Sequence, residues 1–210
     1  IVFGIENNGA WLKDNKMGYP DIDGATIDFS DSSVTFPEMD NRIIAEQYTN
    51  TLGFFAQYEI KLDKITLSAG GRFDNYNIES RKENHGDQSG DVLSPRLTVK
   101  YDIVDYLQAR LSYAHGYRAP QIFNEDLHIE TSGARQVIHR NDPELEKETS
   151  HSYMASLDFN KSYGETSLGI LIEGFYTKLN NPFASDFGEP DETGTVIYTR
   201  VNAENGAVVQ

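Results

Sequence analysis

Residues 93–117, which read LSPRLTVKYDIVDYLQARLSYAHGY, decide the fold class of this 210-residue chain. Apolar and polar side chains alternate strictly on both sides of a short break at 102–105. The apolar positions are Pro95, Leu97, Val99, Tyr101, Leu107, Ala109, Leu111 and Tyr113, and the polar ones between them are Arg96, Thr98, Lys100, Gln108, Arg110 and Ser112. A period of two is typical of a β-strand with unlike faces, so this stretch predicts a β-hairpin.

The same alternation recurs along the chain. It covers residues 52–60, 65–73, 153–159 and 168–176, with Phe55 as an exception. The predicted hairpins pair 49–62 with 64–76, 93–102 with 105–117, and 147–160 with 165–179. Together with the opening segment and Thr195–Val201, these segments predict about eight strands. The fold class is therefore all-β, an antiparallel up-and-down meander.

The connections between these strands alternate in length. Short turns are expected near 62–64, 102–105 and 160–165. Long polar stretches are expected at 9–46, 77–92, 118–147 and 180–194. Short turns at one end and long loops at the other are typical of a transmembrane β-barrel.

Side-chain placement supports a large barrel. Aromatic residues at the strand ends predict interfacial girdles, with Phe73, Tyr76, Tyr117 and Phe183 at the end that carries the long loops. Charged residues such as Arg72, Arg96 and Arg110 occupy the face opposite the apolar one. Such charges are tolerated in a wet or protein-filled lumen, which an eight-stranded barrel lacks, so the strands are expected to be part of a larger transmembrane β-barrel.

Composition excludes several other classes. No window approaches the eighteen or more apolar residues that a membrane-spanning helix requires. The chain has no cysteine, and its net charge of −15 argues against nucleic acid as a partner. No arrangement of catalytic residues is recognisable, so we expect neither enzymatic activity nor a cofactor.

Three groups of residues carry a family resemblance. They are the segment 93–127 with its Tyr117-Arg118-Ala119-Pro120 box, the box Asn141-Asp142-Pro143-Glu144-Leu145, and the segments 173–183 and 200–203. Their order and spacing resemble the TonB-dependent receptor family from about residue 48 onward. The second box departs from the family's Asn-Pro-Asp-Leu pattern by an inserted Asp.

This resemblance implies a transporter in the outer membrane of a Gram-negative bacterium. Members of the family have a twenty-two-stranded barrel filled by an N-terminal plug, which the TonB complex pulls to admit a scarce ligand bound outside. Residues 1–210 are therefore expected to be a partial barrel, an interior piece without the plug domain and the C-terminal strands. The implied partners are outer-membrane lipid, the TonB complex through the absent plug, and an iron chelate, haem or cobalamin ligand. The isolated piece is expected to curl or self-associate, because its apolar face would otherwise meet water.

The resemblance also indicates candidate ligand contacts. Haem receptors of similar sequence use a histidine between the two boxes, and His128 and His139 lie there. Glu130 would fall on the same side of an extended loop as His128, and Arg118 could pair with a ligand carboxylate. Solvated loop histidines, and a structural role for Arg118 at the loop base, are the competing interpretations.

Two other functions remain open from sequence. A complete eight-stranded outer-membrane barrel acting as an adhesin or enzyme would have its first strand bonded to its eighth. A soluble carbohydrate-binding β-sandwich would bury Leu97, Leu107, Leu111 and Ile170 against a second sheet.

Overall fold

The computed structural model describes residues 1–16, 24–35, 42–81, 86–121, 137–189 and 196–209. In these residues every regular element is a strand. The strands are β1 Val2–Lys16, β2 Thr26–Asp28, β3 Ser33–Thr35, β4 Arg42–Leu62, β5 Ile65–Ser80, β6 Gln88–Val104, β7 Leu107–Arg118, β8 Val137–Asn141, β9 Glu148–Tyr163, β10 Thr166–Asn180, β11 Phe183–Phe187, β12 Val196–Asn202 and β13 Ala207–Val209. No helix long and apolar enough to cross a membrane occurs in the described residues.

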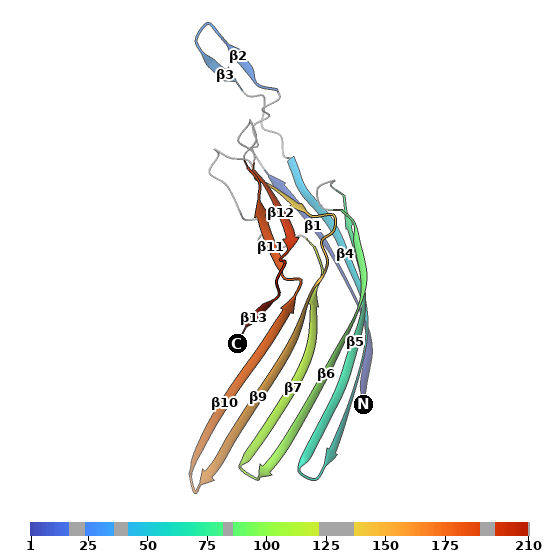
Figure 1. Cartoon of the computed structure of the whole chain (residues 1–210), viewed down its shortest axis with the longest axis vertical. Helices are drawn as coiled ribbons and strands as arrows, with labels where there is room; N and C mark the ends of the chain where they lie inside the picture. The colour runs from blue at the N-terminus through green and yellow to red at the C-terminus, as the bar shows by residue number, and fades with distance from the viewer. Residues whose placement is uncertain (17–23, 36–41, 82–85, 122–136, 190–195, 210) are drawn as a thin grey trace.

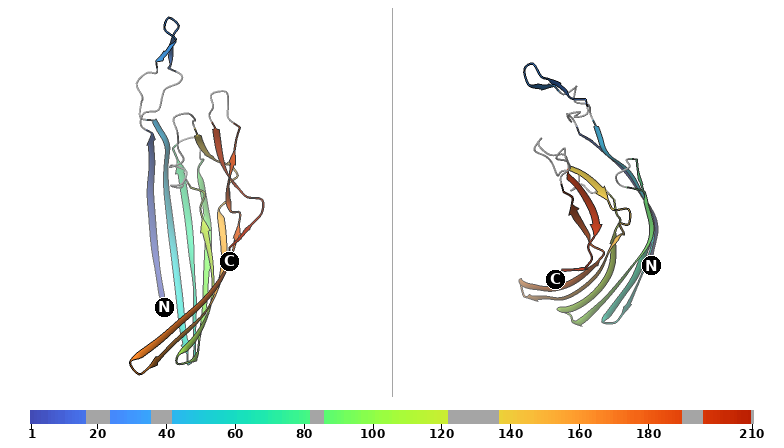
Figure 2. Two further views of the ribbon diagram at one scale, coloured as in Figure 1. Left: turned by 90° about the vertical axis from the view of Figure 1, so that its left-hand side faces the viewer. Right: turned by 45° about the horizontal axis from the view of Figure 1, so that its top comes forward.

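Eight strands form one curved antiparallel sheet in the order β1-β4-β5-β6-β7-β9-β10-β13 (Figures 1 and 2). The three predicted hairpins are confirmed as β4–β5, β6–β7 and β9–β10. Their short turns lie at the same end of the sheet (Figure 1). Two of these turns contain a residue with positive φ, at 45° for Asp63 and 64° for Gly164.

Positive φ at a turn residue matches the twist of the two strands that the turn joins. These residues therefore account for the tight β4–β5 and β9–β10 connections.

The two faces of the sheet follow the predicted alternation. One cross-strand row runs through Leu67, Val99, Leu111 and Ala155, all on the apolar face, which is called the outer face below. Leu97, Leu111 and Ile170 are 51%, 62% and 49% exposed, so no second sheet covers them. The sandwich alternative is therefore wrong.

The sheet is also open in the part of the chain that the structure describes. β1 lies at one edge and β13 at the other, and β1 pairs with β4 alone. The first strand is thus not bonded to the eighth, which contradicts the alternative of a closed eight-stranded barrel.

One predicted strand has a different place. Thr195–Val201 was expected in the meander, but β12 forms a separate three-stranded sheet with β11 and β8, in which β8 and β12 run parallel. The eighth strand of the main sheet is instead the short β13, which pairs with the end of β10. All residues of β12 are partly buried, so its strand-like sequence does not mark a place in the main sheet.

The long polar stretches are shorter than predicted. Strand structure extends to Lys16 in β1, begins at Arg42 in β4, and reaches Ser80 in β5. Within the predicted loop 9–46, β2 and β3 form a separate hairpin. In the extended part of β5 the alternation of burial continues, with Tyr76 and Ile78 buried and Asn75 and Asn77 exposed, so the loop predicted from residue 77 begins later than expected.

Candidate functional site

Two of the predicted ligand contacts, Arg118 at the end of β7 and His139 in β8, lie at the end of the sheet opposite the short turns (Figure 1). His128 and Glu130 lie outside the described residues. His139 belongs to β8, where the backbone is described and the side chain is not. Their ligand-binding role therefore stays a prediction.

The first motif box anchors the end of β7. The Tyr117 ring stacks on Tyr76 of β5, with ring centroids 5.9 Å apart, and Ala119 packs against the same cluster. Pro120 is fully buried. The Arg118 guanidinium carbon lies 5.8 Å from the centre of the Phe183 ring in β11. The box thus connects the main sheet to the small one.

Two girdle predictions are wrong. Tyr76 and Tyr117 belong to a buried cluster with Ile78 and Val92 rather than to an interfacial ring. Tyr76 shares its face with Asp74, opposite the outer apolar row. The regular β6–β7 register ends at Arg96 and Ala114, and beyond it the Tyr117 ring stacks on Tyr76.

The second box is a turn that packs against the first. The Asn141 Nδ2 donates to the Pro120 carbonyl at 3.4 Å. The inserted Asp142 accepts the Glu144 N–H at 2.7 Å through its carboxylate, and its carbonyl accepts the Leu145 N–H at 3.0 Å. Leu145 is 3% exposed and Pro143 is exposed. The extra residue therefore closes the turn that buries Leu145.

A clamp around Glu146 holds the small sheet to the main one. The Asn202 Oδ1 accepts the Glu146 N–H at 2.7 Å, and the Asn202 Nδ2 donates to the carbonyls of Glu146 at 3.0 Å and Asn181 at 2.8 Å. The Asn181 Nδ2 donates to the Glu146 carboxylate at 2.8 Å, and the Phe183 N–H donates to the Glu148 carboxylate at 3.0 Å. The residues around the second box thus stabilise the contact between the small sheet and the ends of the main-sheet strands.

An ion cluster on the inner face was not predicted from sequence. Arg72 pairs with Glu6 at 2.5 Å and with Asp74 at 2.7 Å, and so joins β5 to β1 across β4. Between them lies Gly53 of β4, where a Cβ would collide with the Arg72 guanidinium and lie 2.5 Å from an Asp74 oxygen. The sequence signal for this cluster was Gly53, which lies on the same face of its strand as charged residues. A glycine inside a strand often marks the close approach of another group.

Two histidines also meet across β7 and β9. His115 is the direct partner of His151, and their ring centroids are 5.0 Å apart. The His151 Nδ1 shares a hydrogen bond of 2.9 Å with the Tyr113 hydroxyl. In the described residues, no group of three or more His, Cys, Asp or Glu side chains is placed to hold a metal ion.

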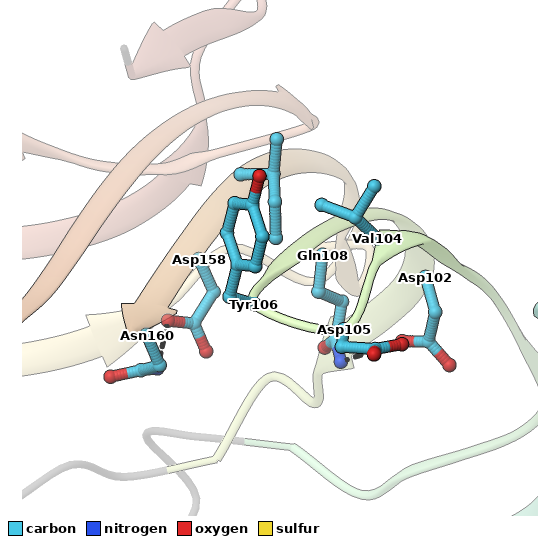
Figure 3. Close-up of a pocket in the computed structure, with 8 residues that line it drawn as sticks. Asp102, Val104, Asp105, Tyr106, Gln108, Asp158 and Asn160 are labelled. Carbon is cyan, nitrogen blue, oxygen red and sulfur yellow. Dashed lines mark hydrogen bonds between the residues drawn. The ribbon is translucent and has the colours of Figure 1, made fainter. Parts of the chain in front are cut away.

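At the short-turn end, an acidic pocket of about 340 Å³ lies between the β6–β7 and β9–β10 hairpins (Figure 3). Asp102 accepts a hydrogen bond from Gln108 at 3.1 Å, and Asp158 accepts one from Asn160 at 2.6 Å. Figure 3 shows each amide beside its carboxylate. These pairs make the pocket a polar turn region rather than a metal centre.

The chain matches one family model over residues 3–210, described as TonB dependent receptor-like, beta-barrel. No curated protein matches the chain in sequence.

Three solved structures illustrate its structural likeness. The hemophore receptor HasR from Serratia marcescens, a double mutant in complex with its hemophore HasA and heme, has a TM-score of 0.62 and 15% identity over 98% of this chain and 38% of its own. The FrpB iron transporter from Neisseria meningitidis (F5-1 variant) has a TM-score of 0.57 and 15% identity over 76% of this chain and 22% of its own. The copper transporter OprC has a TM-score of 0.58 and 11% identity over 95% of this chain and 30% of its own. At these identities the likeness shows the fold, and the chain spans well under half of each structure.

Proposed function

The chain belongs to the TonB-dependent receptor β-barrel family, and we propose that it forms part of the wall of an importer in the outer membrane of a Gram-negative bacterium. The observation that carries this proposal is the two-faced sheet. Its outer face exposes Leu97, Val99 and Leu111, while its inner face carries Arg96, Lys100 and Arg110. Lipid on one side and a wet or protein-filled lumen on the other satisfy both faces.

An apolar surface groove supports lipid contact. It has a volume of about 610 Å³ and is bordered by Leu97, Leu111, Tyr113, Tyr153 and Tyr176, among others. Three of these residues form an aromatic row, with Tyr113 and Tyr153 centroids 5.2 Å apart and Tyr153 and Tyr176 centroids 6.3 Å apart. Aromatic rings at the ends of apolar strands suit a membrane interface.

The proposed cargo is a scarce ligand such as an iron chelate, haem or cobalamin. The similar structures include an iron transporter, a hemophore receptor with heme and a copper transporter, which favours a metal-bearing cargo. We propose His128, Glu130, His139 and Arg118 as its contacts, and the TonB complex as the source of energy through a plug domain. The role is transport rather than catalysis.

Growth of a strain that carries the full-length receptor tests the proposal. Deleting the receptor should abolish growth that depends on uptake of its cargo, and the receptor should fractionate with the outer membrane. A receptor found outside that membrane would contradict the proposed function.

The candidate contacts have a sharper test. If haem is the cargo, the H128A/H139A double variant should lose haem-dependent growth, whereas the control H85A should grow normally. With a siderophore cargo, both variants should grow like the wild type. Unchanged haem uptake in a normally exported H128A/H139A receptor would exclude ligation by these histidines.

A further inference from the structure

We propose that the inner face carries an oxyanion-binding site, formed by Arg96 of β6 and Arg110 of β7, for a carboxylate or phosphate group. The inference rests on the proposed function, because it takes the inner face as the wall of the lumen. It goes beyond that function by assigning a site within the wall, apart from the candidate contacts in the long connections.

The two arginines line one pocket. Its volume is about 260 Å³, and its lining consists of Gln57, Ser68, Gly70, Arg96, Thr98 and Arg110. Arg96 lies opposite Ala114, and Arg110 lies opposite Lys100. The two arginines are thus four positions apart along the strands, about 13 Å at a rise of about 3.3 Å per residue. Both side chains line the pocket, and Thr98 lies between their two positions along β6.

The floor of the pocket leaves room for a ligand. Gly70 is the cross-strand partner of Arg96 on one side and of Gln57 on the other. A Cβ at Gly70 would lie 3.2 Å from the Gln57 Cβ, so the glycine lets the Gln57 side chain lie at the edge of the pocket. The Gln57 amide and the Thr98 hydroxyl supply further hydrogen-bonding groups at its edge.

The charge of this pocket is not neutralised in the described residues. Arg72, on the same face, pairs with two carboxylates, and Lys100 pairs with Asp102 at 3.4 Å. By contrast, no ion pair in the described residues includes Arg96 or Arg110.

The polar contacts nearby do not replace an anion. The Arg110 guanidinium donates to the Gln108 amide oxygen at 3.5 Å, the upper limit of a hydrogen bond. The neighbouring Glu59 accepts from the Ser68 hydroxyl at 2.8 Å. The chain has 33 acidic and 18 basic residues, so a shortage of carboxylates does not explain two unneutralised arginines.

The chemistry of arginine selects the ligand class. A guanidinium presents a planar fork of donors that matches the two oxygens of a carboxylate or phosphate. Two such forks at opposite ends of one pocket suit an anion held between them. The anion could be a carboxylate side chain of another part of the receptor or a free small molecule, and the experiment distinguishes these sources.

The first arm measures binding of inorganic phosphate to the full-length receptor in nonionic detergent, by equilibrium dialysis. If the anion is free, the wild type should bind phosphate and R96Q/R110Q should bind at least about tenfold more weakly, as expected for loss of charge-assisted hydrogen bonds. The matched control K100Q removes a paired cation from the same face and should change binding by less than about twofold.

The second arm detects a carboxylate that already occupies the site. Carbodiimide treatment of the R96K and R110K receptors should join the introduced amine to that carboxylate, and mass spectrometry maps the cross-link. A cross-link to a carboxylate from outside the pocket supports the site, as does phosphate binding that depends on both arginines. A cross-link to Glu59, or neither phosphate binding nor a cross-link, would overturn the inference.

Membrane fractionation of the same variants separates the two levels of the proposal. A receptor that reaches the outer membrane and supports growth, but shows neither result, contradicts the anion site alone. A receptor absent from the outer membrane contradicts the proposed function.

Discussion

The outer and inner faces of the main sheet are built from alternate residues of the same strands, yet their chemistry is opposite. On β7, Leu111 is 62% exposed on the outer face, and its neighbour Arg110 lines a polar pocket on the inner face. The outer face has no packed partner in the described residues. On the inner face, side-chain hydrogen bonds and ion pairs join neighbouring residues. Under the proposed function, lipid covers the outer face, whereas polar contacts within the chain organise the inner one.

The largest expected effect comes from moving a charge between the faces. L111R should destabilise the full-length receptor in bilayers by about 2–4 kcal/mol, the cost of arginine against the hydrocarbon layer. S112R, one residue further along β7, places the same charge on the inner face and should cost less than about 1 kcal/mol. Denaturant titration in lipid vesicles measures both, and equal losses would contradict the assignment of the faces.

A smaller effect is expected at the inner ion cluster. G53A adds a methyl group where the Arg72 guanidinium passes over β4, and should cost about 1–3 kcal/mol through overpacking. G71A is the matched control, because a Cβ at Gly71 meets nothing within 4 Å. Equal stability of G53A and the wild type in the same titration would show that Arg72 does not need this gap.

Sequence predicted the main sheet because strict alternation reports two unlike environments. It flagged Phe55 as an exception without explaining it. The register places Phe55 on the inner face opposite Gly4, where a Cβ would lie 2.6 Å from the Phe55 Cζ, so the glycine accommodates the ring. Such cross-strand compensation joins distant residues and cannot be read from one segment.

The candidate site was less predictable. The motif boxes were found from sequence, but their contacts depend on β12, which was expected in another sheet. Asn202 clamps Glu146 across 56 positions of the chain. Arg96 and Arg110 were predicted to face inward, whereas their shared pocket depends on the β6–β7 register.

A local effect is expected at that clamp. N202A removes three exposed hydrogen bonds and should destabilise the small sheet by about 1–2 kcal/mol, since each such bond contributes about 0.5 kcal/mol. Hydrogen exchange should quicken in β8, β11 and β12 and stay unchanged in β4–β7. The control N160A removes an exposed amide at the opposite end and should leave all of these rates unchanged. Faster exchange throughout the main sheet would contradict a local clamp.

The smallest effect is expected at the exposed end of the ion cluster. E6Q weakens the pair with Arg72 but leaves the pair with Asp74. The stability difference from the wild type should be small and should disappear at high salt, because exposed ion pairs are screened. The loss in G53A is steric and should persist. A salt-independent loss in E6Q would show that Glu6 acts by packing rather than by charge.

Cysteine accessibility along β7 tests the central claim most directly. The chain contains no cysteine, so single replacements at positions 107–113 report one site at a time in a full-length receptor free of other exposed thiols. In outer membranes, a water-soluble maleimide should label Q108C, R110C and S112C and should spare L107C, A109C and L111C, which face lipid. Equal labelling of both sets, or labelling of the outward set alone, would contradict the account of this sheet as a barrel wall.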